Sequence, residues 1–260
     1  VQQLFHLPAD PALLHHGQHA PGLVVLSLVI AIFTSWMALQ MTAYSRSQAS
    51  ISRQLHRLCL MAGSLALGCG VWAMHFIGML AFELGTSVDY APGLTLLSIV
   101  PGVVASFVAL STISRRAISA QRLLGSGLLV GLGIGAMHYL GMHAMRLALS
   151  LRYDPVLFAL SLLVAVVLAT LALWIRFGLR GWSTALGPSQ RNLIGAGVMG
   201  CAIAGMHYVG MHAARFVGTI PPGNDADADR PLLVFSVTLM TIALTILVAS
   251  AVGVLRYREL

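Results

Sequence analysis

The sequence predicts an all-helical integral membrane protein with seven transmembrane helices. Of its 260 residues, 58% are hydrophobic and only 9% are charged, whereas a soluble domain has roughly 25% charged residues. Apolar runs of about twenty residues recur along the chain, and each is long enough to cross a hydrocarbon core as a helix. Because backbone groups in lipid must bond internally, we expect these runs to be helical. A short motif that recurs three times predicts that the helices form repeats.

Charged residues divide the apolar sequence into seven spans. We expect them at residues 23–44, 58–82, 93–113, 123–148, 155–177, 192–217 and 232–255, between an external leader (1–22) and the start of a cytoplasmic linker (256–260). Eleven of the 15 arginines follow the first, third, fifth or seventh span. Arginine accumulates in cytoplasmic loops. The N-terminus is therefore expected outside and the C-terminus in the cytoplasm, as in a multi-pass protein of a bacterial inner membrane.

The net charge of +7 does not indicate a nucleic-acid partner, because the arginines lie in short loops between apolar spans, where they act as a topology signal. Cys59, Cys69 and Cys201 lie in or beside apolar spans and form no CxxC pair. A disulfide framework is therefore not expected, and buried cysteines at such places are usually packing residues.

One motif occurs three times, at residues 72–79, 135–142 and 204–211. Its copies read Trp-Ala-Met-His-Phe-Ile-Gly-Met, Gly-Ala-Met-His-Tyr-Leu-Gly-Met and Ala-Gly-Met-His-Tyr-Val-Gly-Met. The histidines are 63 and 69 residues apart, which fits two helices per repeat. Repeats of two helices keep one orientation, so we expect three parallel repeats around a pseudo-threefold axis along the membrane normal.

An aspartate and a proline follow each copy. Proline is tolerated in the first turn of a helix, so these pairs are expected to start the third, fifth and seventh spans. The pairs are Asp89 and Pro92, Asp154 and Pro155, and Asp229 and Pro231.

The motif histidines are the main candidate metal ligands. Each lies seven to ten residues before the outer end of its predicted span, roughly 10–15 Å below the surface. A titratable ring at that depth is costly unless it faces the bundle and finds a partner. Residues four apart share a helix face, which pairs each histidine with a methionine. The pairs are His75 with Met79, His138 with Met142, and His207 with Met211.

Imidazole and thioether together favour copper, with zinc less favoured, and the oxygen ligands that hard ions need are missing. Secondary thioether candidates are Met74, Met137, Met206 and Met145. Glycines in and before the motif would let the three helices approach closely enough for the side chains to meet. They are Gly78, Gly141, Gly210, Gly68, Gly131 and Gly200.

Other polar residues near the motif have less defined roles. His143 and His212, five residues beyond the motif histidines, either complete a second metal centre or bond a neighbouring helix; the first copy has Leu80 there. A charged collar at the mouth is expected from Glu83, Arg146 and Arg215. The leader histidines are a weaker metal-capture candidate than an irregular solvated segment. They are His6, His15, His16 and His19.

A purely structural interpretation competes with the metal site. A single intramembrane histidine is often an interhelical hydrogen-bond partner, and methionine in a helix usually fills core gaps. Three buried imidazoles at one depth are harder to explain by packing alone, so triplication favours a ligand role.

The tripled motif, together with seven spans, resembles the MHYT domain of bacterial membrane sensors. The resemblance rests on Met74-His75-Phe76, Met137-His138-Tyr139 and Met206-His207-Tyr208 and covers the chain from about Leu23 to Leu255. It implies a non-catalytic sensor of oxygen, carbon monoxide or nitric oxide, with copper as the bound metal. It also implies a cytoplasmic output domain, following Leu260, that makes or degrades cyclic di-GMP.

Two other functions stay open from the sequence. A copper or proton carrier or channel would also use Met and His side chains, but should continue its ligands toward the cytoplasmic half, where the spans offer glycine, alanine, leucine and two cysteines. A haem-binding electron carrier with paired axial histidines, holding haem iron, would be coloured. The sequence leaves a homodimer undecided.

Overall fold

Helices make up most of the chain in the computed structural model, which describes residues 5, 14–15, 17–47, 53–86, 88–115, 117–181, 187–219 and 230–259. The helices are α1 (Pro21–Ser47), α2 (Arg53–Leu80), α3 (Pro92–Leu97), α4 (Ile99–Ile113), α5 (Ala120–His143), α6 (Pro155–Gly181), α7 (Pro188–Ala213) and α8 (Arg230–Glu259). α3 and α4 follow one another directly and together occupy the third predicted span.

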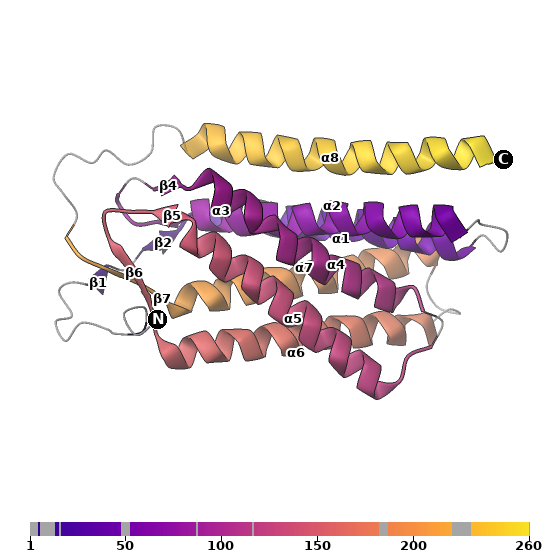
Figure 1. Cartoon of the computed structure of the whole chain (residues 1–260), viewed down its shortest axis with the longest axis horizontal. Coiled ribbons are helices and arrows are strands. Elements are labelled where there is room, and N and C mark those ends of the chain that lie inside the picture. The colour runs from indigo at the N-terminus through magenta and orange to yellow at the C-terminus, as the bar shows by residue number, and fades with distance from the viewer. Residues whose placement is uncertain are drawn as a thin grey trace.

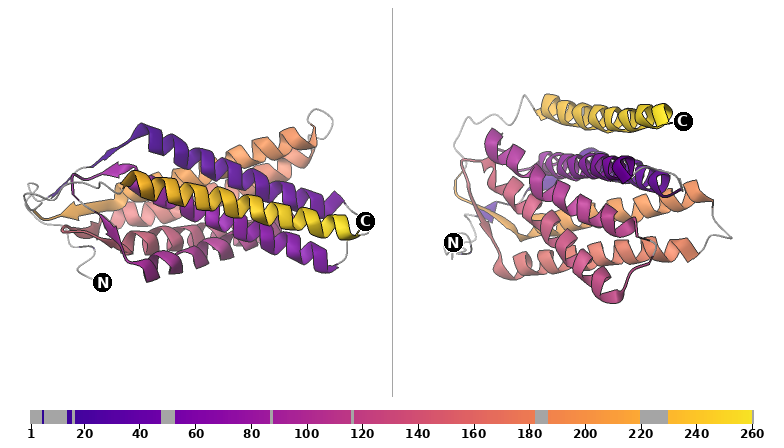
Figure 2. Two further views of the ribbon diagram at one scale, coloured as in Figure 1. Left: turned by 90° about the horizontal axis from the view of Figure 1, so that it is seen from above. Right: turned by 45° about the vertical axis from the view of Figure 1, so that its right-hand side comes forward.

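The helices of the first six spans close into a ring in chain order. α1 packs on α2, α2 on α4, α4 on α5, α5 on α6, α6 on α7, and α7 returns to α1. α2, α5 and α7 also contact one another, so the three helices that carry the motif are central. α8 packs along α2 and lies outside the ring (Figure 1, Figure 2).

Short strands gather at one end of the bundle, on the left in Figure 1, which we call the strand end. They are β1 (Leu14–His15), β2 (Gln18–His19), β3 (Phe82–Glu83), β4 (Asp89–Tyr90), β5 (Met145–Arg146), β6 (Ser150–Tyr153) and β7 (Ala214–Val217). β2 pairs with β3, β4 with β5 and β6 with β7, all antiparallel, and β1 adds to β7. In each of the three pairs, one strand precedes a helix pair and the other follows it.

One backbone hydrogen bond recurs beside each strand pair. The N–H groups of Ala20, Ala91 and Asp154 donate to the carbonyls of Ala81, Ala144 and Ala213, at 2.8, 2.8 and 2.9 Å. The two ends of each helix pair are therefore tied together in the same way three times.

Several predicted span ends are wrong by a few residues. The runs predicted to extend to residues 148 and 217 leave the helix at His143 and Ala213, because their last apolar residues form β5 and β7. Helices also begin earlier than predicted, since residues counted as loop start them. Ser119 accepts the backbone N–H of Arg122 at 3.3 Å and caps α5, and Pro188 occupies the first turn of α7.

The third span is not one continuous helix as predicted but is interrupted at Ser98. Pro101 has no N–H to donate to the carbonyl four residues earlier, and its ring crowds that carbonyl. The carbonyl belongs to Leu97, the residue at which α3 ends. Pro92 and Pro155 start their helices as predicted, and Asp154 caps α6 by accepting the N–H groups of Val156 and Leu157. Asp89, by contrast, lies in β4.

The prediction of an irregular leader is wrong for its described residues. Leu14–His15 and Gln18–His19 are paired strands, and the ring Nε2 of His15 lies 2.8 Å from the carbonyl oxygen of Gly218. These residues find strand partners in the segments that leave α7 and α2. His6 and His16, like Asp229, lie outside the described residues.

Within the described part of the chain, six helical segments are long and apolar enough to cross a membrane. They are Pro21–Ala43, Gln54–Leu80, Pro92–Ile113, Ala120–His143, Pro155–Gly178 and Ser189–Ala213. The seventh predicted span falls on α8, where the described residues include a shorter apolar helix, Phe235–Leu247. On α6, exposed apolar side chains recur every three or four residues, as on a helix face that meets lipid. They are Leu160, Leu163, Val167, Leu171 and Trp174. The prediction of a helical, multi-pass membrane protein is confirmed at this level.

Candidate metal centre

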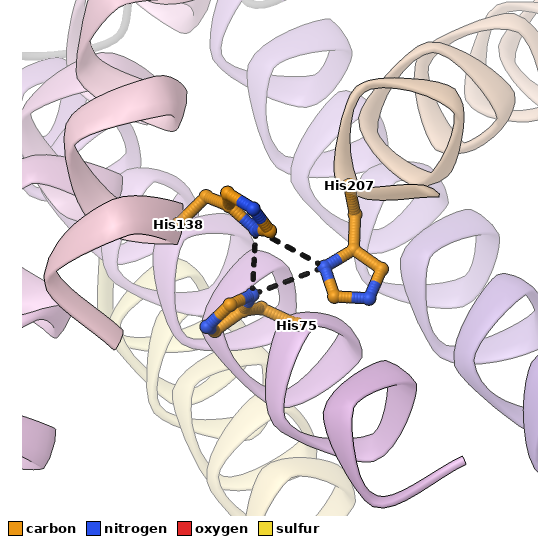
Figure 3. A group of neighbouring side chains, drawn as sticks. All are labelled: His75, His138 and His207. Atoms are coloured by element: carbon orange, nitrogen blue, oxygen red, sulfur yellow. Dashed lines mark hydrogen bonds between the residues drawn. The ribbon is translucent and has the colours of Figure 1, made fainter. Parts of the chain in front are cut away.

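The three motif histidines meet at the centre of the bundle, where α2, α5 and α7 contact one another. His75, His138 and His207 are buried, with relative exposures of 0, 0 and 1%. Their Nδ1 atoms point toward one another at 3.1, 3.2 and 3.3 Å (Figure 3). Among the described residues, this is the group of three or more His, Cys, Asp or Glu side chains placed closely enough to hold a metal ion. We call it the histidine triad.

The spacing of the Nδ1 atoms matches the edge of a tetrahedral metal site. Imidazole nitrogens about 2.0–2.1 Å from an ion are roughly 3.3–3.4 Å apart in a tetrahedron. Three neutral rings alone cannot satisfy one another in this triangle, because each Nδ1 offers either one proton or one lone pair. A cation at the centre accepts all three lone pairs and leaves a fourth position for another ligand. The donor set therefore fits a metal ion.

Each imidazole ring rests against a motif glycine of another central helix. A Cβ added to Gly141 would collide with Nε2 of His75, one at Gly210 with Nε2 of His138, and one at Gly78 with Nε2 of His207. The sequence predicted close helix approach at these glycines. The structure fills each space with an imidazole, so glycine orients the ring as well as admitting it.

Glycines about two turns before each motif histidine serve a different contact. A Cβ at Gly68 would collide with Val103 of α4, one at Gly131 with Val166 of α6, and one at Gly200 with Ile32 of α1. Each central helix is thereby held close to the first helix of the neighbouring pair.

The aromatic residue after each histidine packs on its ring. The ring centroids of His75 and Phe76, His138 and Tyr139, and His207 and Tyr208 are 5.1, 4.8 and 4.9 Å apart. The hydroxyl of Tyr139 bonds Ser161, and that of Tyr208 bonds Ser27 at 2.9 Å. These bonds fix the aromatic rings between central and outer helices.

Methionines lie on both sides of the triad. Met79, Met142 and Met211, one turn toward the strand end, are buried in one cluster with Phe216 of β7. Met74, Met137 and Met206, which precede the histidines, are also buried. Met145 is half-buried in β5 beside the first cluster. The predicted thioethers thus lie on either side of the triad, and Phe216 of β7 packs against those at the strand end.

The remaining predicted site residues lie apart from the triad. His143 and His212 are exposed at the ends of α5 and α7. Glu83, Arg146 and Arg215 lie on β3, β5 and β7, opposite Gln18, Asp89 and Arg152. Arg215 donates to the carbonyls of His212 and Ala214 at 2.6 and 3.0 Å.

His19 of β2 comes nearest to the triad among the described leader histidines. Its ring centroid is 4.9 Å from that of Phe82 and 5.5 Å from that of Tyr208. Burial lowers the pKa of His19, and the neighbouring His212 lowers it further. The neutral form of the His19 ring is therefore favoured at the strand end.

The histidines lie closer to the helix ends than predicted, with five or six helical residues after each instead of seven to ten. Sequence reasoning also missed Ser27, Ser98 and Ser161, which bond the motif's aromatic residues. A signal was present, since each serine lies six residues after the proline that starts its helix segment.

The comparisons with known proteins agree with this architecture. The family model described as MHYT, bacterial signalling protein N terminal repeat, matches residues 68–126, 131–187 and 200–259. No solved structure matches the chain significantly.

Three curated relatives cover most of the chain. The bifunctional diguanylate cyclase/cyclic di-GMP phosphodiesterase MucR of Pseudomonas aeruginosa is 40% identical over 235 residues, or 87% of this chain and 33% of that protein. The cyclic di-GMP phosphodiesterase NbdA of the same species is 37% identical over 83% of this chain and 27% of that protein. The signaling protein YkoW of Bacillus subtilis is 34% identical over 80% of this chain and 26% of its own length. The chain thus spans about a third or less of these relatives.

Proposed function

Because this chain belongs to the MHYT family of bacterial signalling protein N-terminal repeats, we propose that it is a sensor module that holds a metal ion at its histidine triad. The metal is copper, the sensed ligand is a diatomic gas such as oxygen, carbon monoxide or nitric oxide, and the module itself is not catalytic. The observation that supports the metal is the convergence of three buried Nδ1 atoms within 3.1–3.3 Å.

The choice of copper rests on the donor set. Imidazole suits copper, zinc and iron, and thioether adds a preference for soft Cu(I). Met79, Met142 and Met211 are buried one turn from the triad. When bound, copper would supply an open coordination position for a small ligand. The triad would hold the ion, and the motif glycines would fix the orientation of its rings.

Haem fits the triad poorly. Two axial imidazoles need a macrocycle between them, and three Nδ1 atoms within 3.3 Å of one another leave no room for one. A carrier is also disfavoured, because the side chains around the cavity below the triad supply the thioethers of Met199 and Met206 but no imidazole, thiol or carboxylate that would continue a path of ligands.

The proposed signalling requires a defined orientation in the membrane and a cytoplasmic output domain. We place the strand end outside the cell and the C-terminal end of α8 in the cytoplasm, because eleven of 15 arginines follow odd-numbered spans. α8 is then the seventh span, and α1–α2, α3/α4–α5 and α6–α7 are repeats around a pseudo-threefold axis through the triad. The host membrane is a bacterial inner membrane. By analogy with MucR and NbdA, the output is a cyclic di-GMP cyclase or phosphodiesterase domain.

The coupling proceeds through packed helices. A change at the triad moves α2, α5 and α7 relative to one another, and α8 packs along α2. In this proposal the helices have two arrangements in equilibrium. Gas binding shifts that equilibrium only by as much as the two arrangements differ in affinity for the gas.

Elemental analysis tests the metal. The purified chain is expected to contain one copper per chain, and the His75→Ala, His138→Ala and His207→Ala variants to lose it. His143→Ala is the matched control, because His143 is exposed on the same helix as His138. Equal copper content in all five proteins would overturn the proposal.

Gas binding is tested separately. Carbon monoxide added to the Cu(I) protein is expected to give the infrared stretch of copper-bound carbon monoxide, which the triad variants lack. A copper-loaded protein without that band would refute the gas assignment while leaving the metal site intact.

A further inference from the structure

A small internal cavity of about 40 Å³ lies below the histidine triad, on the side away from the strands. Two sets of side chains from the three central helices line it. Val71, Ile134 and Ile203 come four residues before the motif histidines, and Leu67, Val130 and Met199 come eight before. Because matching positions of all three helices contribute, the cavity lies beneath the meeting point of the rings.

The cavity lining is apolar. Its one polar side chain is Ser106, whose hydroxyl donates to the carbonyl of Gly102 at 2.8 Å. A buried water needs two to four polar partners, whereas apolar cavities stay dry and take up apolar ligands such as xenon. A site for one water needs only about 10–15 Å³ of such volume, so 40 Å³ admits a diatomic molecule or one xenon atom.

The cavity lies close to the triad on the side away from the strands. Val71, Ile134 and Ile203 lie one helical turn from the histidines, or about 6 Å along the axis, and Met206, which precedes His207, also lines the cavity. On the opposite side, an open pocket reaches Tyr139 and Met142. Between that side and the triad, Met79, Met142 and Met211 are buried with exposures of 3, 0 and 4%, and Phe216 of β7 packs against them. Transfer of apolar solutes from water into hydrocarbon is favourable, so a diatomic gas is concentrated in the membrane at the level of this cavity.

We propose that this cavity is the holding site for the diatomic ligand and that the gas reaches the triad from the hydrocarbon side, not through the strand end. The assignment rests on the proposed gas-sensing function and adds the route and the residues that control it. Ala165, Ala169 and Ala172 of α6 form one wall. Their small side chains leave the volume open.

Xenon is the direct probe, because its binding does not depend on the metal. Crystals of the full chain under xenon pressure are expected to show one atom in the cavity. Ala169→Val adds two methyl groups to the wall and is expected to abolish that site, and Val71→Ile, which adds one, serves where the first variant does not fold. Ala159→Val is the matched control, because Ala159 is exposed on the same helix.

A kinetic measurement tests the route. After flash photolysis of the carbon monoxide complex, rebinding from solution is expected to be at least threefold slower in Ala169→Val than in the wild type or Ala159→Val. Copper content should be equal in all three. An empty cavity under xenon, or unchanged rebinding in a variant that excludes xenon, would overturn the assignment.

The two proposals fail in different ways. Xenon bound in a protein that holds no metal would refute the proposed sensor while leaving a gas cavity. Copper that binds carbon monoxide in a protein with no xenon site would refute the cavity alone.

Discussion

The indole N–H of Trp72 lies 3.1 Å from the hydroxyl of Ser98 and 3.0 Å from the carbonyl of Thr95. At the other two contacts between neighbouring helix pairs, a tyrosine hydroxyl bonds the corresponding serine. The first motif copy has Phe76 in place of that tyrosine, and Trp72 stands one turn earlier, where the other copies have glycine or alanine. A different side chain therefore makes the same connection between a central and an outer helix.

Loss of this bond should destabilise the contact between the first and second helix pairs. Trp72→Phe keeps an aromatic ring but removes the N–H donor, and a buried hydrogen bond is worth about 1 kcal/mol. Thermal unfolding in detergent should show a lower Tm, whereas Trp174→Phe, at an exposed position, should leave it unchanged. Equal shifts in the two variants would show that the bond to Ser98 contributes nothing.

The motif glycines should control metal affinity. Gly141→Ala places a Cβ against Nε2 of His75, and disturbance of a residue that orients a ligand typically costs about 10- to 100-fold in affinity. Competition with a Cu(I) chelator should detect this loss. Gly197→Ala is the control, because a Cβ there meets nothing within 4 Å. Wild-type affinity in Gly141→Ala would show that the contact with Gly141 does not orient the ring of His75.

The methionines one turn from the triad should tune the reduction potential of the copper without binding the ion alone. Met142→Leu preserves volume but removes a soft donor, so copper content should persist while the Cu(II)/Cu(I) potential falls by on the order of tens of millivolts. Redox titration measures the change, with Met61→Leu at an exposed position as control. An unchanged potential in Met142→Leu would assign this methionine to packing only.

Acidification should loosen the strand end. Burial, followed by the charge of His212, lowers the pKa of His19 below its usual 6.5. Below that value the unfolded segment takes up a proton that the folded ring resists, so stability falls as the pH drops from 6.5 toward the folded pKa. Hydrogen-exchange protection of the β2–β3 amides should be lower at pH 5 than at pH 7.5. His19→Gln should remove this dependence, and its persistence in that variant would assign it to another group.

Much of the helical fold followed from simple properties of the sequence. Apolar length identified the spans, and a repeat of one motif identified the three central helices. A helix interior is encoded locally by a continuous run of apolar residues, so these features need no partner to be recognised.

The strands and the break at Ser98 could not be predicted in the same way. β5 and β7 consist of apolar and arginine residues that also suit a helix end, and they become strands only because a partner segment lies beside them. Pro101 lies inside a continuous apolar run, so hydropathy alone does not show the break.

Part of the candidate site was likewise predictable from the sequence, and part was not. Recurrence of His75, His138 and His207 predicted that the rings share one depth, and the structure places them together. Helix periodicity did not reveal that Nε2 of each ring rests on a glycine of another helix, nor that His143 and His212 are exposed. Those facts depend on helix rotation and on the next helix in the ring.

The three strand pairings have a mechanical consequence. β2–β3, β4–β5 and β6–β7 each join the segment that enters a helix pair to the segment that leaves it. These pairings restrain the two helices of each pair from separating at the strand end. The triad lies near this restrained end of α2, α5 and α7. We therefore expect a displacement at the rings to be small there and to become larger along these helices toward the far end of the bundle, where α8 also ends (Figure 1).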